Sequence, residues 1–148
     1  MLTIKAEVVS QPCSLRPGDE NIQVDFGTLI NKDLLHDGRI LDKNFKIHLE
    51  DCTPEIAKNV RVTFTGKGAA EDGSVLALAE NSLAKGIGIG FKHAGKVLPL
   101  NQASRPMILA TGSNLLDFSA YVKLLPSSNN SLEPGAFTAS ANFILNYD

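Results

Sequence analysis

The last fourteen residues of the chain, GAFTASANFILNYD, constrain its fold more than any other stretch. Apolar side chains recur there at every second position, which is typical of a long β-strand that buries one face. The apolar positions are Phe137, Ala139, Ala141, Phe143, Leu145 and Tyr147. A long strand of this kind leaves a sheet edge or a groove open, and an open edge exposes unpaired backbone groups. We therefore expect another strand to cover it.

Alternation of the same kind recurs along most of the chain. It predicts strands over 2–8, 22–27, 45–52, 60–66 and 115–125, with shorter candidates at 74–79, 86–91 and 106–110. Turn residues separate these runs at intervals of roughly eight to twelve residues, which is typical of an all-β sandwich. The stretches 31–37 and 79–86 have weak helical patterns but are too short for stable helices. We expect both to be turns or connectors within one domain.

The composition excludes several classes of protein. With 148 residues, 43% of them hydrophobic, the chain is long and apolar enough for a single domain with a real core. A net charge of −2 argues against nucleic acid as a partner, because such proteins are usually basic. No apolar stretch approaches the roughly 20 residues that a membrane helix needs, so we expect no membrane insertion. The first residues also lack the pattern of a signal peptide, which fits a cytosolic or an already processed protein.

Two cysteines, Cys13 and Cys52, leave three possibilities: free thiols, a redox pair or one disulfide. They are too far apart for a CxxC motif and lack the companion ligands of a zinc site. We prefer a structural disulfide. Closing a loop of this length stabilises a fold by roughly 4 kcal/mol in the chain-entropy model, and the bond would place the protein in an oxidising compartment.

No catalytic or metal-binding pattern is present in the sequence. The stretch GIGIGF (86–91) has the spacing GxGxG and precedes no helix, so we interpret it as a closely packed or bent strand rather than a nucleotide-binding loop. His36, His48 and His93 lack the spacing of metal ligands and are interpreted as surface residues. The serines lack a GxSxG elbow. We expect no metal, no cofactor and no enzymatic activity.

Four stretches and the C-terminal pattern resemble a known family. The stretches are AEVVSQPCSL, IQVDFGTL, FKIHLEDC and FSAYVKL. AEVVSQPCSL is similar to the segment that joins the N-terminal extension to the first strand, and IQVDFGTL is similar to the second strand. FKIHLEDC is similar to the strand with the second half-cystine, and FSAYVKL is similar to a late strand. The most specific match is Gly135, fourteen residues from the C-terminus, together with the penultimate Tyr147. The chain resembles the pilin subunits of chaperone–usher fimbriae of Gram-negative bacteria, such as type 1 and P pili.

The resemblance implies an incomplete immunoglobulin-like β-sandwich that lacks its last strand. Residues 1–12 would be the N-terminal extension and residues 13–148 the pilin domain, stapled by a Cys13–Cys52 disulfide. The missing strand leaves a groove between the first strand and the last, which a donor strand from another chain completes by β-augmentation. The implied groove and chaperone-recognition residues are Gly135, Phe137, Ala139, Ala141, Phe143, Leu145, Tyr147 and Asp148.

The implied donor strand is the alternating segment at the N-terminus. Its apolar residues are Leu2, Ile4, Ala6 and Val8. Burying about four such side chains contributes roughly 6–12 kcal/mol, before the cost of ordering the strand. Extensions of this family usually begin several residues earlier, so we expect the natural extension to be longer. Ala6 stands where the family often has glycine, and its methyl group is expected to change the fit in a neighbour's groove.

The function implied is that of a structural subunit that polymerises by donor-strand complementation and exchange. We favour a minor subunit (adaptor, anchor or terminator) over the major rod subunit. The implied partners are a periplasmic chaperone, an outer-membrane usher and neighbouring subunits, first in the periplasm and then in an extracellular fimbria. The alternative is a single-domain immunoglobulin-like adhesin that binds a ligand through loops such as 66–73 or 126–135.

Overall fold

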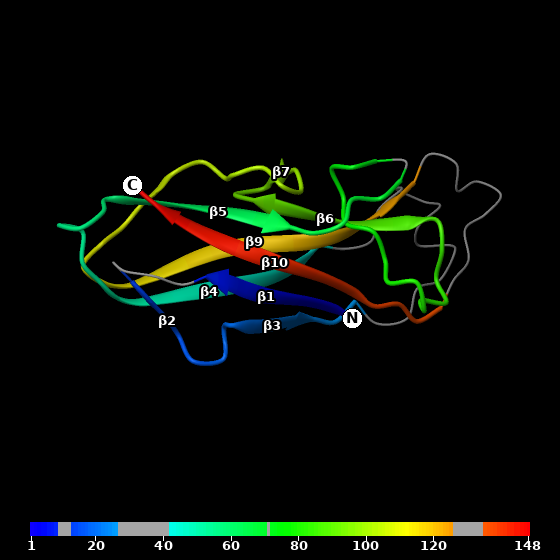
Figure 1. The fold of residues 1–148 in the computed structure, drawn as a ribbon, viewed down its shortest axis with the longest axis horizontal. Coiled ribbons are helices and arrows are strands. Elements are labelled where there is room, and N and C mark those ends of the chain that lie inside the picture. The colour runs from blue at the N-terminus through cyan, green and yellow to red at the C-terminus, as the bar shows by residue number, and fades with distance from the viewer. Residues whose placement is uncertain (9–12, 27–41, 71, 126–134) are drawn as a thin grey trace.

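The computed structural model describes residues 1–8, 13–26, 42–70, 72–125 and 135–148. In these parts of the chain, two five-stranded sheets pack face to face as an elongated sandwich (Figure 1). The described residues contain no helix at all, and so none that is long and apolar enough to cross a membrane. The prediction of an all-β sandwich is confirmed.

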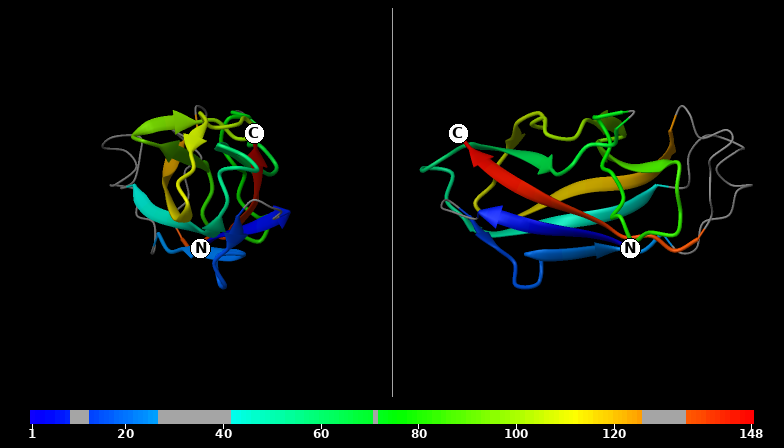
Figure 2. Two further views of the ribbon diagram at one scale, coloured as in Figure 1. Left: turned by 90° about the vertical axis from the view of Figure 1, so that its left-hand side faces the viewer. Right: turned by 45° about the vertical axis from the view of Figure 1, so that its right-hand side comes forward.

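The first sheet contains both ends of the described chain. Its strand order is β3 (Asn21–Val24), β1 (Leu2–Val8), β10 (Ala139–Tyr147), β5 (Asn59–Thr65) and β8 (Met107–Ile108). Neighbouring strands are antiparallel except β1 and β10, which run in the same direction (Figures 1 and 2). We call this sheet the β1 sheet.

The second sheet is antiparallel throughout. Its strand order is β2 (Ser14–Leu15), β4 (Lys43–Cys52), β9 (Gly112–Leu124), β6 (Ile87–His93) and β7 (Lys96–Leu98). The pairing of β4 with β9 runs from Lys43 to Cys52 and forms the centre of this sheet. We call it the β9 sheet.

Most of the predicted strands are present, with shifted ends. The stretch 74–79 forms isolated bridges at Leu76 rather than a strand, and the short strands β2 and β7 were not predicted. The stretch 79–86 is a turn and bridge segment, as expected. The other weak helical candidate, 31–37, lies outside the described residues, as does His36.

Four phenylalanine rings join the two sheets at the centre of the core. Phe64 of the β1 sheet stacks on Phe91 of the β9 sheet, with ring centroids 4.4 Å apart. Phe118 meets Phe64 edge-on at 5.1 Å, and Phe45 contacts all three other rings. Offset and edge-to-face contacts of this kind add to the stabilisation that burial of the rings already provides.

The glycine-rich strand β6 is closely packed, as the sequence indicated. A Cβ atom added at Gly90 would lie 2.2 Å from the ring of Tyr121, and one added at Gly88 would lie 2.6 Å from Val75. Because Tyr121 is buried, its ring has little room to move away. Glycine is therefore required here for close side-chain approach, and the interpretation as a structural strand is confirmed.

Cys13 and Cys52 form a disulfide, which confirms the preferred interpretation. Cys52 is the last residue of β4 and pairs with Gly112 at the start of β9. The bond therefore attaches the beginning of the domain to the end of the β9 sheet's central pair of strands. We call this end of the sandwich the Cys13 end.

Candidate functional site: the strand position beside β10

Two different strands flank β10. On one side, β5 pairs with it in antiparallel register, from Asn142 to Tyr147. On the other side, β1 runs parallel to it, with Leu2 opposite Ala139 and Ala6 opposite Phe143 (Figure 1). The strand position beside β10 is thus filled, in this structure, by the N-terminal segment of the same chain.

The alternating side chains of β1 point into the core as the sequence predicted. Leu2 and Ile4 are completely buried, and Ala6 is half-buried against the core cluster. Burial of two large aliphatic side chains contributes roughly 3–6 kcal/mol. Val8 pairs through its backbone with Ile144, and its side chain lies outside what the structure describes.

The backbone of β1 is paired on both sides only in the first half of the strand. On its outer side, β3 pairs only with the segment from Leu2 to Lys5, and the N–H of Ala6 then donates to the carbonyl of Glu20 (3.0 Å). The register with β10 shifts between Ala6 and Val8, as in a β-bulge. In this structure β10 and β3 border the strand position that the N-terminal segment β1 occupies.

The beginning of the predicted last strand, before Ala139, has irregular neighbours. The N-terminal amino group of Met1 donates to the carbonyl of Phe137, and the N–H of Ala139 donates to the carbonyl of Met1 (3.0 Å). From the other side, the N–H of Leu83 donates to the carbonyl of Ala136 (2.9 Å). The side chain of Phe137 is buried, so the inward alternation starts before the regular strand does.

Gly135 has a local structural reason to be glycine. Its φ of +136° lies in a region that other residues rarely adopt, and an added Cβ would lie 2.9 Å from the Cβ of Leu83. Any other side chain would therefore strain the backbone and displace the segment around Leu83. The family resemblance implies a role of Gly135 in chaperone recognition, which stays a prediction, and the backbone gives a separate reason for glycine at this position.

The last residues of β10 extend beyond the reach of β1. Leu145 is buried and Tyr147 is half-buried, but the pairing with β1 ends at Ile144. The hydroxyl of Tyr147 is buried and has no hydrogen-bond partner among the described residues, and burial raises its pKa above the usual 10.0. The backbone oxygen of Asp148 accepts hydrogen bonds from the N–H groups of Lys58 and Asn59, both at 2.9 Å.

Of the predicted groove residues, Ala139, Ala141, Phe143, Leu145 and Tyr147 lie on β10, whereas Gly135 and Phe137 precede that strand and Asp148 follows it. Those that face the core and are buried are Phe137, Ala139, Ala141, Phe143 and Leu145. What sequence reasoning missed was the segment 79–84, which hydrogen-bonds to residues 136 and 138 of the chain and so lies along the start of the last strand. Its weak helical pattern gave no sign of this contact.

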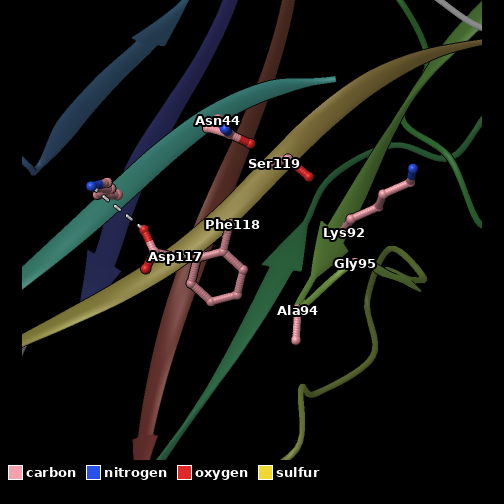
Figure 3. Close-up of a pocket in the computed structure, with 8 residues that line it drawn as sticks. Asn44, Lys92, Ala94, Gly95, Asp117, Phe118 and Ser119 are labelled. Carbon is pink, nitrogen blue, oxygen red and sulfur yellow. Dashed lines mark ion pairs between the residues drawn. The ribbon is translucent and has the colours of Figure 1, made fainter. Parts of the chain in front are cut away.

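A second concave surface lies on the outer face of the β9 sheet. It is a depression of about 320 Å³, bordered by Asn44, Asp117, Ser119 and Lys92 (Figure 3). Its charged groups are already paired: Lys46 with Asp117 at 3.9 Å and Lys92 with Asp42 at 2.9 Å. Within the described part of the chain, no three His, Cys, Asp or Glu side chains come together as metal ligands. This depression presents no convergent binding groups.

The two described histidines have structural neighbours. The ring Nδ1 of His48 lies 2.9 Å from Asp19 Oδ2, and the same oxygen accepts the backbone N–H of His48 at 2.7 Å. These contacts hold the segment before β3 against β4. The ring of His93 packs on Phe118, with centroids 5.0 Å apart. Both residues are partly exposed, as predicted for surface histidines.

One of the two loops predicted for the adhesin alternative, 66–73, contains the carboxylate of Asp72, whereas the other, 126–135, lies almost entirely outside the described residues. Asp72 accepts hydrogen bonds from the Lys123 Nζ (2.6 Å) and from the Ser74 hydroxyl (2.6 Å) and N–H (3.0 Å). These bonds, that of Lys123 above all, lower the pKa of Asp72 to about 2. The carboxylate thus fastens the loop to the β9 sheet.

Comparison with known proteins gives consistent matches. A family model described as "Fimbrial protein" matches residues 2–148. The "Major MR/P fimbria protein" of Proteus mirabilis (strain HI4320) is 38% identical over 143 residues, covering 95% of this chain and 79% of that protein. The P pilus rod subunit PapA superimposes with a TM-score of 0.81 at 26% identity, covering 93% of this chain and 99% of PapA. A solved chaperone–usher pilus gives the same TM-score and identity, with 97% and 92% covered.

Proposed function

The chain belongs to the fimbrial protein family and is a structural subunit of a chaperone–usher pilus, and we propose that it joins its neighbours through the strand position beside β10. One observation carries the proposal. The internal strand β1 of the β1 sheet precedes the disulfide-bonded start of the domain, and only residues 9–12 separate the two. A strand attached in this way can be exchanged without unfolding the rest of the sandwich.

The same side chains serve both roles in this proposal. Leu2 and Ile4, which fill the chain's own groove here, would enter the groove of another copy during assembly. Backbone hydrogen bonds along β10 then provide affinity, and the alternate buried side chains provide fit. Before assembly, a periplasmic chaperone would occupy this position and pass the subunit to an outer-membrane usher, and the finished fimbria would be extracellular.

The direction of the inserted strand follows from the difference between a fibre and a closed dimer. In this structure β1 is parallel to β10, so its C-terminal end lies near Ile144, toward the Cys13 end. Insertion into a neighbour in the same direction would bring the two Cys13 ends together, and two copies could then close on each other. A fibre needs a head-to-tail contact. We infer that the donor strand enters its neighbour antiparallel to β10.

The place of the subunit within the fibre is a separate matter. The expectation of a minor subunit rather than the major rod subunit stays a prediction, because a relative's place in its own fibre does not fix the place of this chain. Quantitative mass spectrometry of purified fimbriae would test it, since a minor subunit should be far less abundant than the rod protein.

The proposal can be tested by separating the acceptor from its own donor. The Ile4→Asp variant places a charge in the core position of β1 and should therefore release the groove. A synthetic peptide of residues 1–12 should then bind and raise the melting temperature, because a ligand that binds only the folded state stabilises it. The matched control is the same peptide with Leu2 and Ile4 both replaced by Asp. Equal melting with the two peptides would refute the proposal.

A further inference from the structure

We infer that the Cys13 end of the sandwich carries an apolar contact surface, formed by Ile56 and Ile108, that packs against the next copy of the chain in the fibre. The inference rests on the proposed strand insertion and identifies a second surface that the insertion brings into contact. Both side chains are unusually exposed for their size: Ile56 by 63% and Ile108 by 85%.

Both isoleucines adjoin the start of β5, Ile56 in the preceding turn and Ile108 by strand pairing. Ile56 belongs to the turn that follows Cys52, where its N–H donates to the carbonyl of Thr53 (3.0 Å). Ile108 lies on β8, the edge strand of the β1 sheet, opposite Asn59 at the start of β5. It borders a depression of about 410 Å³, whose other lining residues are Pro54, Glu55, Lys58 and Leu109. The left end of Figure 1 shows the turn between β4 and β5, beside the C-terminus.

The length of the connection places this end near the neighbour. Residues 9–12 are all that separates Val8 from Cys13. Because an extended chain spans at most about 3.6 Å per residue, the two can be no more than roughly 18 Å apart. When residues 2–8 lie in a neighbour's groove, the Cys13 end must therefore lie beside that groove's mouth. A second copy of this chain is thus the occupant of the isoleucine surface.

The direction of insertion selects the opposite end of that neighbour. An antiparallel donor strand would leave the groove where Met1 now lies, beside Phe137. At this end Leu83 is 67% exposed and lies along the start of the last strand, through the hydrogen bond from its N–H to Ala136. A depression of about 220 Å³ surrounds it, lined also by Asn81, Ser82, Ala136, Phe137 and Thr138. The isoleucine surface of one copy therefore packs against Leu83 of the next.

Engineered disulfides in assembled fibres test this contact. Fibres assembled in vitro from this chain alone and carrying both Ile108→Cys and Leu83→Cys are oxidised mildly, denatured to separate the inserted strands and run on a non-reducing gel. We expect a ladder of covalent multimers that a reductant removes. The pair Ile56→Cys and Leu83→Cys provides a second, independent version should the first variant not assemble. All three substituted side chains are exposed, so the fold should tolerate the changes.

The controls separate this inference from the proposed function. Val97→Cys with Leu83→Cys is the matched control, because Val97 is also exposed (48%) but lies on β7, along the side of the sandwich (Figure 1). Normal fibres without a ladder in either test pair would overturn the isoleucine surface and leave strand insertion standing. An equal ladder in the Val97 control, or dimers with Ile108→Cys alone, would overturn that surface as well. Absence of strand exchange in the unmodified chain would overturn the proposed function itself.

Discussion

The two sheets contain five described strands each, but they are completed in different ways. In the β9 sheet, every neighbour is antiparallel, and the ring of Tyr121 on β9 packs closely over Gly90 on β6. In the β1 sheet, an internal strand is parallel to its neighbour β10 and is attached to the domain by a short connection. The β9 sheet therefore contains only antiparallel neighbours, whereas the β1 sheet contains the strand for which we propose exchange.

Ile4→Asp should have the largest effect, because it attacks the exchangeable strand directly. A carboxylate at this fully buried position loses its hydration without gaining a partner, so we expect a loss of several kcal/mol or of cooperative unfolding. Thermal unfolding followed by circular dichroism measures it. The control is Lys5→Asp, since Lys5 is exposed and its replacement should change stability little. Wild-type melting of Ile4→Asp would mean that β1 does not fill the groove in solution.

Cys13→Ser tests the disulfide that attaches the beginning of the domain to the end of β4. The disulfide closes a loop with a sequence separation of 39, and its removal should cost about 4 kcal/mol in the chain-entropy model. Chemical denaturation would measure the loss. The double variant with Cys52→Ser should be no less stable than either single one, because all three lack the same bond. A change in the free energy of unfolding close to zero would show that the β9 sheet is stable without this disulfide.

Gly90→Ala probes the β9 sheet alone. The new methyl group would meet the buried ring of Tyr121, so we expect a loss of about 1–3 kcal/mol from overpacking. The matched control is Gly73→Ala, since a Cβ there meets nothing within 4 Å. Equal stability of the two variants in urea unfolding would show that the Tyr121 ring moves aside easily, and the contrast between rigid and exchangeable sheets would weaken.

Tyr147→Phe should stabilise the β1 sheet slightly, by about 1 kcal/mol, because it removes a buried hydroxyl that lacks a partner among the described residues. The raised pKa of Tyr147 adds a pH test. The neutral form of Tyr147 is favoured in the folded state. The folded state is therefore not penalised below pH 10.0, and it loses stability relative to the unfolded state as the pH rises further. Alkaline melting curves should therefore fall less steeply for the Phe variant. Identical curves would place this hydroxyl in water.

Asp72→Asn should have the smallest effect, because a partly exposed ion pair contributes roughly 0.2–1 kcal/mol. The pKa of Asp72 is about 2 in the folded state and 3.8 ordinarily. The stabilisation that its ionised carboxylate provides is therefore present above pH 3.8 and is lost as the pH falls toward 2. The difference in stability between wild type and variant should therefore shrink over this range. A constant difference would mean that the Lys123 contact is not ionic.

Much of this fold could be predicted from the sequence, because alternation reports directly which residues of a strand face the core. The buried positions of β10 and of β1 as far as Ala6 follow it closely. Strands of two or three residues, such as β2 and β7, are too short for alternation to reveal. Alternation also could not tell that β1 would fill its own groove, or that it would run parallel to β10. Leu2 and Ile4 have the same apolar pattern whichever copy of the chain receives them.

The disulfide determines how a fibre of such subunits carries mechanical tension. If residues 2–8 are anchored in a neighbour, a pulling force enters the domain at Cys13. The Cys13–Cys52 bond passes that force directly to the end of β4, which is paired along most of its length with β9. Residues 14–51 therefore lie outside the covalent path of the load. Stretching would therefore strain the inserted strand and the pairing of β4 with β9.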